Sequence, residues 1–98
     1  MQQFFNTLNL FIEEVKNAPE GQRNITLNKT AIKAMLALES LIPEKPEWMT
    51  DATYSALRFS MRSLTLASLV EAANLAGVDE DEAYVVCKDA ILQFDKKQ

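Results

Sequence analysis

The sequence predicts an all-α protein, a single-domain bundle of four to five helices over residues 1–98. Apolar residues recur at spacings of three and four along most of the chain, which is the period of a helix with one buried face. The 2 Gly and 3 Pro fall between these periodic stretches, where helices would end. No alternating run of β-branched residues and no hairpin dipeptide indicates a strand. The length also leaves room for one domain only.

The first helix is expected before Pro19, because the apolar residues of this segment share one helical face. They are Phe4, Phe5, Leu8, Phe11, Ile12 and Val15. Proline cannot continue a helix and disfavours helical geometry in the residue before it, whereas Gly21 permits a positive φ. The stretch from Ala18 to Gly21 therefore predicts a turn.

The second helix is expected to run to about Leu41, with Asn24 or Thr26 as its N-cap. Its apolar residues again follow one face, and they are Leu27, Ala31, Ile32, Ala34, Met35, Leu38, Leu41 and Ile42. Two prolines close together then predict a stiff loop. We expect Trp48, in this loop, to cover the end of the core rather than to contact a ligand.

The third helical stretch begins at Thr50 or Asp51, either of which can act as a cap, and continues without Gly or Pro to Ala76. Its expected inward residues are Tyr54, Leu57, Met61, Leu64, Leu69 and Ala73. A helix of about 26 residues is long for so small a domain. We therefore favour two helices over residues 51–76, separated near Ser60 to Ser63, and keep a single helix as the alternative.

The last helix has a clear start, because Gly77 stops the preceding helix and Asp79 stands three residues before Glu82, as in a capping box. The acidic run Asp79–Glu82 then lies at the positive end of the helix dipole, which we favour over a metal site. The expected inward residues are Ala83, Val86, Cys87, Ala90, Ile91 and Phe94. Lys96 and Lys97 are expected to close the helix at its negative end.

The composition argues against an enzyme, a metal site or a bound cofactor. The chain has no His, which is the usual general base near neutral pH, and a single Cys. One thiol forms no internal disulfide, and zinc sites depend on clusters of Cys and His. Because Cys87 follows the inward face of the last helix, we expect it in the core rather than as a nucleophile.

Membrane and export signals are also missing from the sequence. No apolar run reaches the roughly 18 residues of a membrane span, and no signal-peptide pattern opens the chain. We therefore expect a cytoplasmic protein with no membrane partner. The net charge of −4 lacks the overall basic character of most duplex-binding modules, so any nucleic-acid contact would depend on local charge.

Two windows of the sequence contain bases and no acids. They are residues 21–33, with Arg23, Lys29 and Lys33, and residues 52–70, with Arg58 and Arg62. Within each window two cations stand four residues apart and so share a helical face. If the two helices are neighbours, the pairs would form one positive patch beside the N–H groups at the start of the second helix, which suits a phosphate.

A resemblance to a known family covers most of the chain and is carried by two strings. The first, APEGQRNITLNKTA over residues 18–31, looks like the signature of the helix-bundle (primase C-terminal-like) domain of phage and plasmid primase-polymerases. The second, residues 69–83, is similar to the approach to that domain's last helix. The last helix itself departs from the family pattern, and no primase catalytic module precedes it in this sequence.

The resemblance implies a non-catalytic accessory module in replication that binds single-stranded DNA or a nucleotide, beside a primase or helicase. On this hypothesis Gly21 allows a close approach of the backbone and Arg23 clamps a phosphate. Asn24 would bond a phosphate or base, and Asn28 and Lys29 would extend the same rim. Lys33, Arg58 and Arg62 complete the predicted basic patch. An Arg that anchors the loop and an Asn that caps the helix would explain the same residues without a ligand.

The alternative is a small protein-interaction module of a phage or mobile element, a homo-oligomer or an inhibitor of a host protein complex, without nucleic-acid binding. Its support is a set of apolar residues outside the main faces, namely Leu10, Leu36, Leu66, Tyr84, Val85 and Leu92. Several of these could form an exposed patch. The sequence does not decide between the two hypotheses, identify the partner or the oligomeric state, or distinguish a whole protein from a fragment of a primase.

Overall fold

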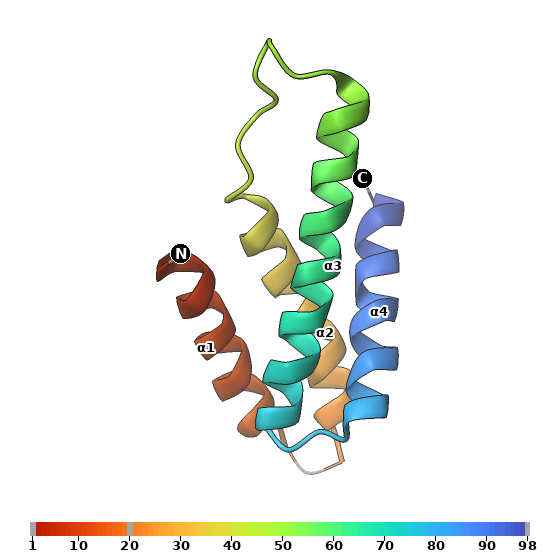
Figure 1. The fold of residues 1–98 in the computed structure, drawn as a ribbon. Helices are drawn as coiled ribbons and strands as arrows, with labels where there is room; N and C mark the ends of the chain where they lie inside the picture. The colour runs from red at the N-terminus through yellow and green to blue at the C-terminus, as the bar shows by residue number, and fades with distance from the viewer. Residues whose placement is uncertain (1, 20, 98) are drawn as a thin grey trace.

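Four α-helices make up the described part of this computed structural model, which covers residues 2–19 and 21–97, with side chains given through Phe94. They are α1 (Gln2–Lys16), α2 (Arg23–Glu39), α3 (Asp51–Leu75) and α4 (Glu80–Lys97). The chain runs down α1, up α2, down α3 and up α4, so consecutive helices are antiparallel (Figure 1). The predicted all-α, single-domain bundle is confirmed, with four helices. Glu20 and the side chains of Lys96 and Lys97 lie outside the described residues.

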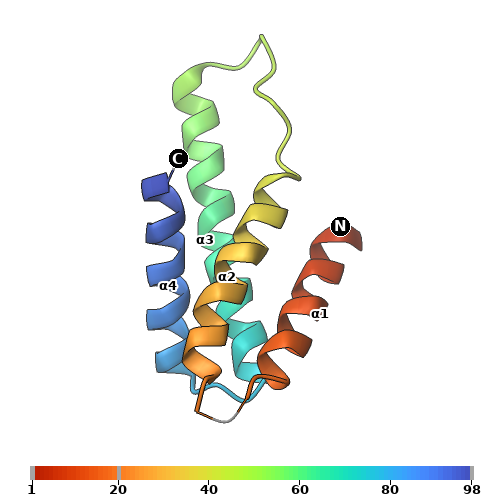
Figure 2. The same cartoon turned by 180° about the vertical axis from the view of Figure 1, so that it is seen from behind.

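The helices α2 and α3 form the middle of the bundle. The flanking helices α1 and α4 each contact both of them and lie on opposite sides, as two views of the ribbon show (Figures 1 and 2). Seen from one side α3 lies in front of α2, and seen from behind α2 lies in front. The outer surface of α3 is therefore not covered by another helix.

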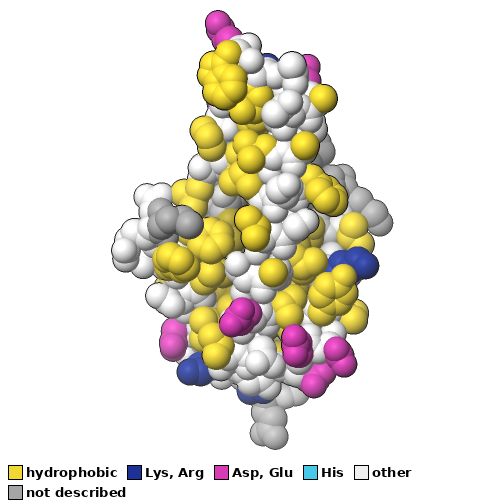
Figure 3. All heavy atoms as spheres, viewed as in Figure 1, with side chains coloured by type: hydrophobic (Ala, Val, Ile, Leu, Met, Phe, Trp, Pro, Cys, Tyr) yellow, Lys and Arg dark blue, Asp and Glu magenta, His cyan; other side chains and the backbone are white. Residues whose placement is uncertain are grey.

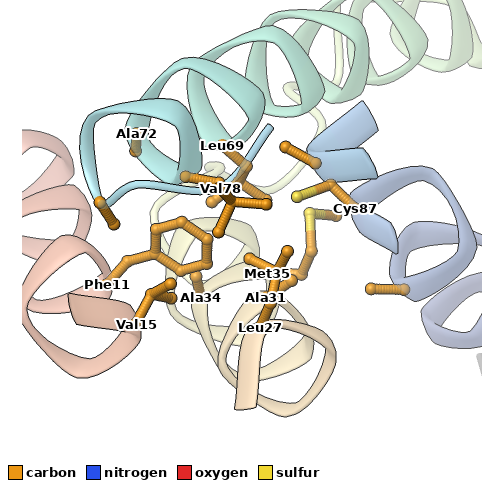
Figure 4. Packing of buried hydrophobic residues seen from close by; sticks show 14 of the residues in the cluster. Phe11, Val15, Leu27, Ala31, Ala34, Met35, Leu69, Ala72, Val78 and Cys87 are labelled. Carbon is orange, nitrogen blue, oxygen red and sulfur yellow. The ribbon is translucent and has the colours of Figure 1, made fainter. Parts of the chain in front are cut away.

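The hydrophobic core fills the lower half of the bundle, where all four helices meet. Phe11 from α1, Met35 from α2, Leu69 from α3 and Cys87 from α4 point toward one another, and Val78 from the α3–α4 turn lies among them (Figure 4). Each of these side chains is at most 3% exposed. The predicted inward faces of α2 and α4 are confirmed for most of their residues.

Three predicted helix boundaries are confirmed by backbone and side-chain geometry. The Thr50 side chain accepts a hydrogen bond from the Thr53 N–H at 3.2 Å and caps α3. Gly77 adopts a φ of 98°, which favours glycine, and the Val78 N–H then donates to the Ala73 carbonyl at 3.0 Å. Asp79 Oδ2 accepts from the Glu82 N–H at 3.3 Å, as predicted for the start of α4.

The start of α2 differs from the prediction. The helix begins at Arg23, and Gln22 occupies the N-cap position without a side-chain hydrogen bond. Asn24 is the second residue of α2, and its exposed side chain donates to the Glu82 carboxylate of α4 instead of capping α2. A tertiary contact has thus replaced the expected local one. Gly21 has a φ of 83°, so the predicted turn is present.

The long third segment is a single helix of 25 residues, so the preference for two helices is wrong. The serines that suggested a break instead bond to the backbone of their own helix. Ser60 Oγ donates to the Ala56 carbonyl at 3.1 Å, and Ser63 Oγ donates to the Phe59 carbonyl at 3.2 Å. Such bonds satisfy the hydroxyls without interrupting the helix.

The core supports only the C-terminal half of α3. Its buried residues are Thr65, Leu69, Ala72 and Ala73. The N-terminal half projects past the end of α4 toward the α2–α3 loop (Figure 1). Leu57 and Leu64, predicted to point inward, are 44% and 67% exposed. Leu57 lies in the half without core support, whereas Leu64 stands next to the buried Thr65 but on the outer side of the helix.

Three further core predictions are wrong for related reasons. Trp48 does not cover the end of the core, since it is 81% exposed in the loop. Leu41 follows the end of α2 and Phe5 lies on the outer turn of α1, and they are 40% and 54% exposed. All three lie toward the end of the bundle that the core does not reach.

Phe11 provides a test of this core. Phe11→Ala should lower the free energy of unfolding by about 3–5 kcal/mol, because it removes a large buried side chain and leaves a cavity. Phe5→Ala, on the same helix but half exposed, should cost less than about 1 kcal/mol. Urea denaturation followed by circular dichroism measures both values. Equal losses for the two variants would contradict the assigned core.

Candidate functional site

The start of α2 is anchored to the turn between α3 and α4. Arg23 Nη1 donates to the Gly77 carbonyl at 3.3 Å, and Asn24 donates to the Glu82 carboxylate. Both residues remain exposed. These contacts fit the structural interpretation of the Arg–Asn pair, in which the two residues join α2 to the neighbouring turn.

The middle of α2 contributes Lys29 and Lys33. Lys33 Nζ lies 2.9 Å from Glu14 Oε1 of α1, and Thr30 donates to the other oxygen of that carboxylate at 3.4 Å. Lys29 is exposed and has no ion-pair partner among the described residues, and Asn28 is half-buried one position before it. The face of α2 that carries Lys33 is thus neutralised by α1.

The other two cations converge on a single carboxylate at the end of α2. Glu39 is 16% exposed at its side chain, and its Oε1 pairs with Arg58 and lies 3.6 Å from Arg62 Nη2. The Arg58 guanidinium lies over the Tyr54 ring at 5.8 Å, and the Arg62 guanidinium lies over the Phe94 ring at 5.7 Å. This group, the Glu39 cluster, joins α2, α3 and α4.

The structure does not bring the eight predicted site residues into one patch. Arg23 and Glu39 stand at opposite ends of α2, about 24 Å apart along the helix axis. Arg58 and Arg62 lie with Glu39, whereas Lys33 turns to α1 and Arg23 to the α3–α4 turn. Gly21, Arg23, Asn24, Asn28 and Lys29 remain together at the lower part of α2. Carboxylates from outside the two windows keep the cations apart, because Glu14 pairs with Lys33 and Glu39 pairs with Arg58 and Arg62.

The outer surface of α3 is free of charge over most of its length. Its exposed members, which we call the uncharged α3 face, are Ala52, Thr53, Ser55, Ala56, Leu57, Phe59, Ser60, Ser63, Leu64 and Ala67. Phe59 is 73% exposed and Leu64 67%. In the space-filling view the middle of α3 is apolar and neutral, and carboxylates gather below it (Figure 3). The two charged residues of this segment, Arg58 and Arg62, pair with Glu39 at the edge of the face, where they line a hollow with Ser55 and Phe59.

Two hollows border the uncharged α3 face. A groove of about 610 Å³ follows the junction of α3 with α4. Ser63, Ala67, Val70 and Tyr84 contribute to its lining, and so do the carboxylates Glu71 and Glu80. On the other side a more apolar hollow of about 330 Å³ lies among α1, α2 and α3. Leu64 borders this second hollow. The face thus combines protruding apolar side chains with a hollow on each side.

The remaining candidates offer no reactive site in the described residues. Cys87 is fully buried, and burial raises the pKa of its thiol to about 11, so the thiol is neutral near pH 7. No group of three metal-ligating side chains occurs in residues 2–19 and 21–94. None of the helices described is long and apolar enough to cross a membrane.

Comparisons of the chain with protein-family models, with curated proteins and with solved structures found no match. The resemblance to the primase helix-bundle domain therefore stays a prediction.

Sequence reasoning missed Phe59 and assigned the wrong side to Leu57 and Leu64. The signal lies in the acid-free window of residues 52–70, which its two arginines make positive in the sequence. Because Arg58 and Arg62 pair with Glu39, the other exposed residues of this window form a neutral surface. The apolar residues expected outside the main faces are also largely exposed, with Leu10, Leu36, Tyr84, Val85 and Leu92 between 46% and 65%.

Removal of the Glu39 charge tests the cluster. Glu39→Gln should lower the free energy of unfolding by about 1–3 kcal/mol, since it leaves two adjacent, partly buried arginines without their shared carboxylate. Glu14→Gln removes the more exposed partner of Lys33 and should cost less than about 1 kcal/mol. Chemical denaturation at low salt measures both. A Glu39→Gln variant as stable as the wild type would exclude a structural role for the cluster.

Proposed function

We propose that this chain is a non-catalytic protein-interaction module and that its contact surface is the uncharged α3 face. The observation that carries the proposal is the exposure of Phe59 and Leu64 on a helix surface without charge. Protein contact surfaces are depleted of charged residues at their centres and enriched in aromatic residues. Exposed apolar patches bordered by polar residues commonly mark such surfaces.

The polar groups of this face support the same proposal. Ser60 and Ser63 each donate to a carbonyl of their own helix, so a partner could cover them without leaving an unpaired hydroxyl donor. The chain lacks His, and its single thiol is buried, which leaves little for catalysis. These features favour binding over chemistry.

Site-specific photo-crosslinking tests the proposal. A photo-reactive phenylalanine analogue replaces Phe59 in one variant and Leu10, which is 65% exposed on α1, in a control variant. Each purified variant is irradiated alone and in an extract of the cells that produce this chain. We expect discrete protein adducts from position 59 and none from position 10. Equal adduct patterns at the two positions, or none at either, would exclude the α3 surface as the contact site.

The primase-related hypothesis remains as a second candidate because one observation favours it. A hollow of about 280 Å³ lies at the turn before α2, lined by Ala18, Pro19, Gly21 and Arg23. Arg23 could reach a phosphate there, beside the free N–H groups of the helix start. The nearby Glu82 and its acidic neighbours in α4 oppose the binding of an anion, so we rank this function second.

Fluorescence anisotropy with labelled single-stranded DNA tests this candidate. If it is right, Arg23→Ala with Lys29→Ala should weaken binding at least five-fold at low salt. The slope of log affinity against log salt should also fall by about 1.4, for two lost phosphate contacts. Lys45→Ala with Lys88→Ala changes the net charge equally and should weaken binding less than two-fold. Equal effects of the two pairs would leave no specific phosphate site at α2.

A further inference from the structure

We infer that the partner of the uncharged α3 face is a second copy of this chain, packed with the two α3 helices antiparallel. This inference rests on the proposed function and adds the identity of the partner and the geometry of the contact. Four kinds of observation carry it: the helix surface, its neighbouring groove, its charge and its area.

The first observation is the shape of the helix surface. Ala56, Ser60, Ser63 and Ala67 follow one another at spacings of three and four, and all are exposed. Residues so spaced lie in line along a helix, and small side chains in line let a second helix approach closely. Phe59 lies on one side of this line and Leu64 on the other, because of their positions on the helical period.

The second observation is that the face holds both a protrusion and a matching hollow, as a two-fold symmetric contact requires. Ser63 is the midpoint of α3 (Asp51–Leu75). An antiparallel pair with its two-fold axis at Ser63 places Phe59 of one copy opposite Ala67 of the other. Ala67 lines the groove between α3 and α4, together with Val70 and Tyr84. Each Phe59 would therefore enter the groove of the opposite copy.

The distribution of charge permits contact between two copies at this face. The chain carries a net charge of −4, so two copies repel each other wherever their acidic surfaces meet. The carboxylates in Figure 3 gather below the middle of α3, and the face itself carries none, although Glu71 and Glu80 line the neighbouring groove. With the two-fold axis at Ser63, Glu71 of one copy lies opposite Ser55 of the other, so like charges are not opposed.

The area and the support of α3 point the same way. Leu57, Phe59, Leu64 and the small residues between them expose on the order of 600 Å² of surface that a partner could bury. A stable interface buries roughly 800 Å² per partner. All the buried residues of α3 lie between Thr65 and Ala73, so its N-terminal half lacks core support. If the two α3 helices overlap along their full length, the N-terminal half of one packs against the C-terminal half of the other, which the core supports.

Analytical ultracentrifugation of the purified full chain tests the inference between 1 and 100 µM. We expect a particle of twice the 11.0 kDa chain mass at the higher concentrations. Ala67→Glu should raise the dissociation constant at least ten-fold, because it places a larger, charged side chain where Phe59 enters, in a groove that already holds Glu71 and Glu80. Ala37→Glu makes the same change at an exposed position of α2 and should leave the dissociation constant unchanged. Circular dichroism establishes that both variants keep their helices.

Disulfide trapping tests the register independently. A two-fold axis at Ser63 brings this residue close to its own counterpart, so Ser63→Cys should give disulfide-linked dimers under mild oxidation. Ala37→Cys should give few, and the buried Cys87 should not interfere. Failure of Ser63→Cys to crosslink above the level of Ala37→Cys would overturn the antiparallel geometry.

The outcomes separate the two proposals. A monomer throughout the concentration range, or a dimer that Ala67→Glu does not weaken, would overturn the second-copy inference. If Phe59 then still crosslinks to a different protein in the extract, the interaction module stands with another partner. If position 59 crosslinks to nothing beyond the control, both proposals fail.

Discussion

The pairing of Glu39 with Arg58 and Arg62 determines how α3 is held in the upper half of this molecule and which side of it carries charge. It attaches the projecting part of α3 to the end of α2, beyond the segment from Thr65 to Ala73 that holds the buried residues of α3. The carboxylate also draws both cations of the segment to the inner side of the helix. The outer side is left neutral and partly apolar, and without this contact α3 would present two arginines at its edge.

The two halves of the bundle are stabilised in different ways. In the lower half all four helices contribute to a dense core in which Phe11, Leu69 and Cys87 are nearly or fully buried. In the upper half the helices separate, and polar contacts such as that of the Tyr54 hydroxyl with the Pro43 carbonyl replace apolar packing. Small domains bury a modest share of their surface, so a contact that covers the upper half would add stability where the chain itself provides least.

The candidate sites differ in what the fold does with their charges. Cations were expected to gather into a patch that would suit a phosphate, but Lys33 and the two arginines of α3 each meet a carboxylate from another helix. Arg23 and Lys29 have no carboxylate partner among the described residues, and Glu82 lies beside this group. In contrast, the middle of the α3 surface is uncharged, and its serines Ser60 and Ser63 are bonded within the helix.

The sequence by itself determined the helical class, the turns at Gly21 and Gly77, a cap at Thr50 or Asp51 and the cap at Asp79, because these depend on periodicity and on contacts a few residues apart. It also placed Cys87 in the core correctly. Only the tertiary structure decided which way Leu57, Leu64 and Trp48 face and whether the cations form a patch. Those outcomes depend on how far each neighbouring helix reaches and on pairs such as Glu39 with Arg58, whose members are distant in the chain. Periodicity defines the faces of a helix, but a face is buried only where another element covers it.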